Sequence, residues 1–121
     1  PPNIVHQSIW ELAGKYSVEF SPGMYSDPDF SMKIWRMGIR VFKGNAKSRV
    51  YHFGSISVKK VKKNKGYHQF ISKWGMTSGT FSKYYLKRGQ PFMGTLENPK
   101  IPFLVKIKSV LKQILSSFSN N

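Results

Sequence analysis

The sequence predicts an α+β fold that is mainly helical and contains one short β-hairpin. Three patterns support this class. Apolar residues recur at helical spacing over residues 103–118, a helix-start signal at Asp27-Pro28 is followed by a stop at Gly38, and two short apolar runs flank the turn Lys43-Gly44-Asn45. With 121 residues the chain is one domain at most. We divide it into a partial domain over residues 1–98 and an amphipathic helix over residues 99–121.

The first third of the chain carries two helix signals separated by a loop. A short helix is expected over 6–13, because three apolar residues precede a stop at Gly14. Residues 15–26 are expected as loop, since Ser21-Pro22-Gly23 is turn chemistry. The next helix should start at Pro28 with Asp27 as its N-cap, because proline suits the first helical position. Its apolar face would hold Phe30, Ile34 and Met37.

The rest of the chain alternates short elements with basic or turn-forming segments. Residues 39–42 and 49–53 are expected as the hairpin strands, followed by a basic loop over 57–66. A helix over 67–74 would turn Phe70, Ile71 and Trp74 inward, and another would begin at Thr77 or Ser78 and stop at Gly89. A connector over 90–102 leads to the last helix, whose apolar positions at helical spacing are Leu104, Ile107, Val110 or Leu111, Ile114 and Phe118.

The charge distribution points to an anionic partner. The net charge is +15, and 15 of the 20 Lys and Arg residues lie between Phe30 and Leu96, where no acid occurs. Such a field attracts nucleic acid, a phosphorylated ligand or an acidic membrane surface. The absence of cysteine excludes a disulfide framework and a thiolate metal site.

The chain shows neither an apolar run long enough for a membrane span nor the pattern of a signal peptide. Because it also begins without methionine, at Pro1, we expect it to start inside a larger protein. The expected location is the cytoplasm, with peripheral contact at the inner membrane face as a further expectation.

The carboxylates and the histidine near the centre of the chain are the best candidates for chemistry. Asp27 and Asp29 have a structural interpretation, because acids at a helix start bind free amides and favour the macrodipole. Their functional interpretation is a general base presented at the helix start. His52 is either a structural residue at a strand end or an anion or metal ligand, since Gly54-Ser55 behind it offers backbone amides.

The basic run after His52 also has two interpretations. It is a solvated loop, or it is a mobile arm whose lysines bind phosphate as point charges. Its lysines are Lys59, Lys60, Lys62, Lys63 and Lys65.

Taken together, these segments resemble a known enzyme family. The stretch from Ile9 to Tyr16 is similar to the "W-x-x-V-G-G-Y" segment of family 2 glycosyltransferases, and residues 20–23 are similar to the loop that follows it. Residues 25–30 resemble the family's Glu-Asp-x-Asp-Leu motif, and residues 50–55 resemble its histidine strand. Lys73-Trp74-Gly75 resembles the helix after that strand. Residues 2–93 therefore resemble the C-terminal, acceptor-side half of a glycosyltransferase with the GT-A fold.

The resemblance implies a reaction and roles for the candidate residues. It implies inverting transfer of a sugar from a nucleotide-sugar donor to a saccharide or lipid-linked acceptor, as in polysaccharide biosynthesis. Asp27 would be the catalytic base, Asp29 a supporting catalytic carboxylate, and His52 the contact to a metal–diphosphate whose cation is Mg²⁺ or Mn²⁺. The lysine run, through Lys65, would cover the donor.

Two departures limit what the chain is expected to do alone. Ser26 stands where the family has glutamate, and neither the nucleotide-binding half nor a metal-binding Asp-x-Asp after a strand occurs in these residues. We therefore expect an incomplete, inactive portion of the enzyme. Its uncovered apolar surface predicts self-association.

Two alternatives remain open. The charge and the interleaved aromatic residues also fit a basic nucleic-acid-binding module, although none of its usual sequence signatures occurs. The last helix either covers the core or lies on an anionic membrane with its lysines toward the headgroups.

Overall fold

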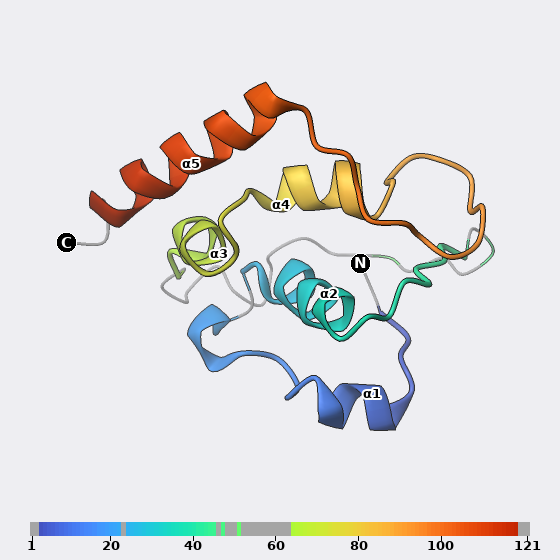
Figure 1. The fold of residues 1–121 in the computed structure, drawn as a ribbon. Coiled ribbons are helices and arrows are strands. Elements are labelled where there is room, and N and C mark those ends of the chain that lie inside the picture. Colours follow the sequence, from blue (N-terminus) through green and yellow to red (C-terminus); the bar gives the residue numbers. More distant parts are fainter. Residues whose placement is uncertain (1–2, 23, 46, 48–50, 52–63, 119–121) are drawn as a thin grey trace.

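The described part of the protein is mainly helical. A computed structural model describes residues 3–22, 24–45, 47, 51 and 64–118 (Figure 1). Its helices are α1 (Gln7–Leu12), a 3-10 turn η1 (Val18–Phe20), α2 (Ser26–Arg36), α3 (Gly66–Trp74), α4 (Ser78–Thr80), a π-helical turn η2 (Phe81–Tyr85) and α5 (Phe103–Phe118).

Helix α2 lies at the centre of the arrangement, with α1 on one side and α3 and α4 on the other (Figure 1). Within α2, Phe30, Met32, Ile34 and Trp35 are buried, as expected for an amphipathic helix facing a core. The core cluster joins α2 to η1, α3 and η2, and its buried members are Phe20, Met32, Trp35, Phe70 and Phe81.

The start of α2 differs from the prediction. The helix begins at Ser26 and is preceded by Tyr25, whose φ of 72° is left-handed, so Asp27 lies in the first turn rather than at the N-cap. Tyr25 packs against Phe70 and Tyr67, with ring centroids 6.1 Å apart in each pair. The chain therefore enters α2 at a left-handed residue whose ring packs against α3.

The predicted hairpin is not observed. Residues 39–45 form no strand, and no residue of the described ranges does. The backbone oxygen of Arg40 instead accepts a bond of 2.9 Å from the amide of Leu96, so this segment runs beside the connector without forming a ladder. Except for Tyr51, the expected second strand over 49–53 lies outside the described residues.

Helix α3 and the turns after it agree closely with the sequence. Gly66 opens α3 at a tight point, because a Cβ there would collide with the carbonyl oxygen of Met24. Gly75, with φ of 68°, ends the helix in the left-handed conformation that favours glycine. Thr77 caps α4 as predicted, since its hydroxyl accepts from the amide of Thr80.

The predicted helix after Thr77 is shorter than expected. It changes to π-helical turns and ends at Tyr85 instead of continuing to Gly89.

Helix α5 has the predicted bounds, and its apolar face points outward. Leu104, Leu111 and Phe118 are 70%, 54% and 76% exposed, whereas Ser109 and Ser116 are buried. Hydrophobic spacing therefore located the helix correctly but left open whether its apolar face covers the core, and in the structure that face is exposed. Small serine side chains let α5 approach α3 closely, and Ser116 also exchanges a hydrogen bond with His68 of α3.

Candidate active site at the start of α2

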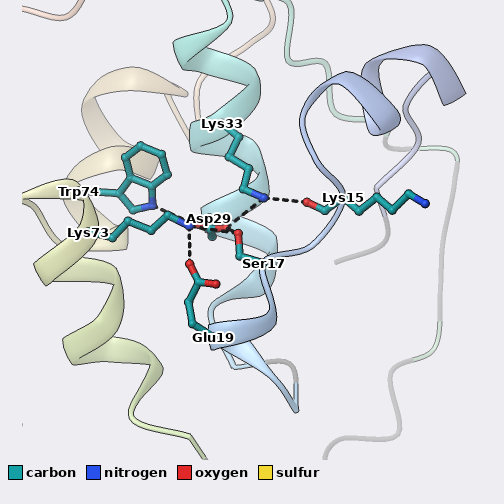
Figure 2. A network of polar contacts seen from close by, with 7 residues as sticks. All are labelled: Lys15, Ser17, Glu19, Asp29, Lys33, Lys73 and Trp74. Carbon is teal, nitrogen blue, oxygen red and sulfur yellow. Dashed lines mark hydrogen bonds and ion pairs between the residues drawn. The ribbon is translucent and has the colours of Figure 1, made fainter.

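Asp29, in the first turn of α2, is fully buried and is surrounded by polar partners (Figure 2). Its Oδ1 accepts a hydrogen bond of 2.8 Å from Nε1 of Trp74 and lies 3.0 Å from Nζ of Lys73. Its Oδ2 accepts a bond of 2.6 Å from the Ser17 hydroxyl and lies 3.9 Å from Nζ of Lys33. The carboxylate thus links α2, α3 and the segment before η1.

Lys73 carries the network outward to a second acid. Its ammonium donates to Glu19 at 2.6 Å and to the Ser17 hydroxyl at 3.0 Å. Burial by itself would lower the pKa of Lys73, but the hydrogen bonds to Glu19 and Asp29 raise it on balance. The hydrogen bond from Lys73 in turn lowers the pKa of Glu19. The contact between Lys73 and Glu19 therefore favours the charged form of each.

The burial of Asp29 decides its role. A buried charge is tolerated only when opposite charges and hydrogen bonds replace the lost water. Asp29 meets this requirement with four partners from three parts of the chain, and its side chain is closed to solvent. It was expected as a supporting catalytic carboxylate, and in the structure its contacts join α2 to α3 and to the segment before η1.

Asp27, two residues before Asp29 in the same helical turn, occupies a different environment. It is half-buried, and its Oδ1 accepts a hydrogen bond of 3.0 Å from the Tyr16 hydroxyl and a longer one of 3.4 Å from Asn3. Burial, followed by the hydrogen bond to Asp27, raises the pKa of Tyr16. The carboxylate therefore stands at the surface beside a phenol that remains protonated at neutral pH.

Sequence reasoning gave Tyr16 no role, although it ends the segment that resembles "W-x-x-V-G-G-Y". Its ring lies edge-on to Trp10 at 4.9 Å and to Phe30 at 5.6 Å. This aromatic cluster holds the phenol over the first turn of α2. Only the resemblance could have singled it out, since an isolated tyrosine carries no spacing signal.

Of the other predicted site residues, Lys65 is the one that the structure describes. His52, Lys59, Lys60, Lys62 and Lys63 lie outside the described residues. Lys65 is exposed immediately before α3. Beside it, the amide group of Asn64 donates to the carbonyl of Met24 at 3.3 Å, so the end of the basic run is fastened near the start of α2.

The described residues do not by themselves compose a site for a divalent cation. No three of their histidine and acidic side chains gather in a group that could hold a metal ion. Asp29 and Glu19 are already engaged with Lys73.

A cleft of about 460 Å³ borders the Asp29 network. Lys73 and Trp74 line it, so the side chains that fix Asp29 also face this hollow. One of its walls is cationic, and Arg40 stacks on the Trp35 ring at 3.9 Å from the ring centroid. The remaining lining residues are Met32, Arg36, Met76, Tyr85, Asn98 and Pro99.

Comparison with known proteins found no match to this chain. No family model, no curated protein and no solved structure matches the chain. In the part of the chain that the structure describes, none of the helices is both long and apolar enough to cross a bilayer.

Proposed function

We propose that this chain is the acceptor-side part of an inverting glycosyltransferase. The observation that carries the proposal is the bond from Trp74 to Asp29, which joins residues 45 positions apart. These residues belong to the two segments that resemble the Asp-x-Asp-Leu and Lys-Trp-Gly motifs of family 2 glycosyltransferases. A shared buried contact between them supports treating the two segments as parts of one site.

In this proposal the two aspartates divide the work. Asp29 fixes the first turn of α2, and Asp27 takes the proton of the acceptor hydroxyl as that oxygen attacks the anomeric carbon of the donor. The bond from the anomeric carbon to the diphosphate breaks on the opposite side, so the configuration inverts and the nucleoside diphosphate leaves with the bonding electron pair. Tyr16 positions Asp27 through the hydrogen bond to Oδ1.

The basic part of the chain is proposed to neutralise the negative charge on the leaving diphosphate. His52 and the lysines from Lys59 to Lys65 lie next to one another in sequence and supply up to five ammonium groups. A bound Mg²⁺ or Mn²⁺ would neutralise diphosphate oxygens in the intact enzyme. The proposed location is the cytoplasm, and the chain alone is proposed to be inactive because it lacks the nucleotide-binding half.

The test is a titration of the isotope-labelled chain with uridine and guanosine diphosphate, with and without MgCl₂, followed by amide NMR shifts. Shifts that gather in residues 52–65 and at the start of α2 are expected. Amide spectra that do not change when the nucleotides are added would refute the proposal. Steady hydrolysis of UDP-glucose by the chain would separately refute its proposed inactivity.

The nucleic-acid-binding alternative predicts a different result. The net charge of +15 and the cationic, aromatic cleft beside Trp74 favour it. Random single-stranded oligonucleotides would then bind with a steep salt dependence, while the nucleoside diphosphates leave the spectrum unchanged.

A further inference from the structure

The outward side of α5 is a continuous apolar surface. Each of its large apolar residues is at least 39% exposed. We call this surface the α5 apolar face, and its members are Phe103, Leu104, Ile107, Val110, Leu111, Ile114, Leu115 and Phe118. Monomeric proteins rarely expose a contiguous apolar surface of this kind unless it binds something.

The inward side of α5 is polar and is fixed to α3. The Ser116 hydroxyl lies 2.7 Å from Nδ1 of His68, and Gln113 donates to the carbonyl of Ser72 at 3.5 Å. Ser109, which is also buried, donates to the Val105 carbonyl within the helix. Since these contacts turn the polar side of α5 toward α3, the α5 apolar face lies on the exposed side of the helix.

The charges of α5 flank this apolar face. Helical residues advance about 100° each, which places Lys106 and Lys108 on opposite borders of the α5 apolar face. Both are exposed, as is Lys112, and the helix contains no acidic residue. An apolar stripe bordered by lysines is the pattern of a helix that lies in the interface of an anionic membrane.

We propose that α5 docks the protein on the surface of an anionic bilayer, lying parallel to it with the α5 apolar face in the boundary between headgroups and acyl chains. Charge complementarity selects this occupant. A second copy of the chain would bring another +15 to the contact, whereas anionic headgroups attract both the flanking lysines and the chain as a whole. The inference uses no residue of the Asp27 site and stands independently of the proposed reaction.

The test measures partition of the chain onto vesicles of phosphatidylcholine alone and of phosphatidylcholine mixed with phosphatidylglycerol. The double variant Leu104→Glu/Leu111→Glu should bind the mixed vesicles at least about tenfold more weakly. The matched control is Val18→Glu/Met93→Glu, which makes the same charge change at side chains 87% and 90% exposed outside α5. The control should retain at least about half of the parent affinity, because it leaves the apolar face intact.

The charge contribution is tested with Lys106→Gln/Lys108→Gln, which should weaken binding to the mixed vesicles about tenfold. Circular dichroism of every variant checks that the helices remain. Failure of the parent chain to bind mixed vesicles would overturn the proposal, as would equal losses in the α5 and control variants. Light scattering that shows a dimer lost only in Leu104→Glu/Leu111→Glu, with vesicle binding unchanged, would assign the face to a second copy instead.

Discussion

The start of α2 and the outer side of α5 invert the usual distribution of polarity in opposite ways. At α2 a carboxylate is fully buried, and at α5 a row of large apolar side chains faces outward. Asp29 is accompanied by two lysines, an indole N–H and a hydroxyl. The side chains of the α5 apolar face are instead left exposed.

This comparison distinguishes departures from the usual burial pattern that serve stability from those that serve binding. An inverted residue that finds all its partners inside the fold, such as Asp29, is explained by stability. An exposed apolar surface as extensive as the α5 apolar face is a feature that binds something outside the chain. Asp27 lies between these cases, since it is fixed by Tyr16 and still reaches the surface.

The sharpest test of the buried half of this comparison is Asp29→Ala, for which we expect the largest effect. Removing the carboxylate leaves Lys73 and the Trp74 N–H without their buried acceptor, and should lower the free energy of unfolding by about 3 kcal/mol. Urea denaturation measures it. The matched variant Asp27→Ala sits in the same helical turn but at the surface, and should cost less than about 1 kcal/mol. Equal losses would remove the distinction between the two aspartates.

The orientation of α5 can be tested by exchanging polarity between its two faces. Ser116→Leu forces a larger side chain into the contact with α3 and breaks the bond to His68, so it should destabilise the protein by about 1–3 kcal/mol. Leu111→Ser makes the reverse exchange on the exposed side and should change stability by less than about 0.5 kcal/mol. The opposite ranking in thermal or urea unfolding would mean that α5 is turned the other way.

The bond between Trp74 and Asp29 can be isolated with Trp74→Phe. The ring remains while the donor is lost, which should cost about 1.5 kcal/mol because the acceptor is charged. Trp10→Phe is the control, since Trp10 makes aromatic contacts but no Nε1 hydrogen bond within the described residues. If Trp74→Phe lowers the free energy of unfolding no more than Trp10→Phe does, the hydrogen bond to Asp29 contributes nothing beyond packing.

The ion pair between Lys73 and Glu19 predicts a smaller effect that depends on pH. The pKa of Glu19 is lowered from 4.5 by folding, so its contribution is present above that value and is lost as the pH falls through the lowered pKa. The stability difference between the parent and Glu19→Gln should therefore be at most about 1 kcal/mol near neutral pH and vanish in acid. Melting temperatures across this range measure it, with Glu97→Gln as the reference for a lost charge. A difference that persists unchanged in acid would contradict the pairing.

At the alkaline end the sign is reversed. The pKa of Lys73 is raised from 10.5, so its contribution is present below that value and is lost as the pH rises through the raised pKa. The contribution of this network to the free energy of unfolding should therefore persist at every pH between the titration of Glu19 in acid and that of Lys73 in base.

Local chemistry made the helices predictable, and tertiary contacts account for most of what the sequence did not reveal. The bounds of α5 and the cap at Thr77 follow from spacing and capping alone. The start of α2 does not, since the helix begins one residue before Asp27, after a left-handed Tyr25 whose ring packs on Phe70. Residues 39–42 form no strand, and Arg40 accepts a backbone hydrogen bond from Leu96 of a distant connector, a contact that local sequence does not indicate.

The candidate site was predictable only in outline. Spacing and helix-start chemistry identified Asp27 and Asp29 as a pair, but neither indicates that one of them is buried. That difference depends on Lys73 and Trp74, which lie more than forty residues further along the chain. The role of Tyr16 depends in the same way on a fold that brings it over α2.

The central claim is that Asp29 and Trp74 join α2 to α3 through a direct bond within one site. A double-mutant cycle of Asp29→Ala and Trp74→Phe tests it by urea denaturation. We predict a coupling energy of at least about 1 kcal/mol, because either change alone removes the same interaction. Losses that simply add, to within about 0.3 kcal/mol, would show that the two residues act separately and would leave the proposed enzyme site without its supporting observation.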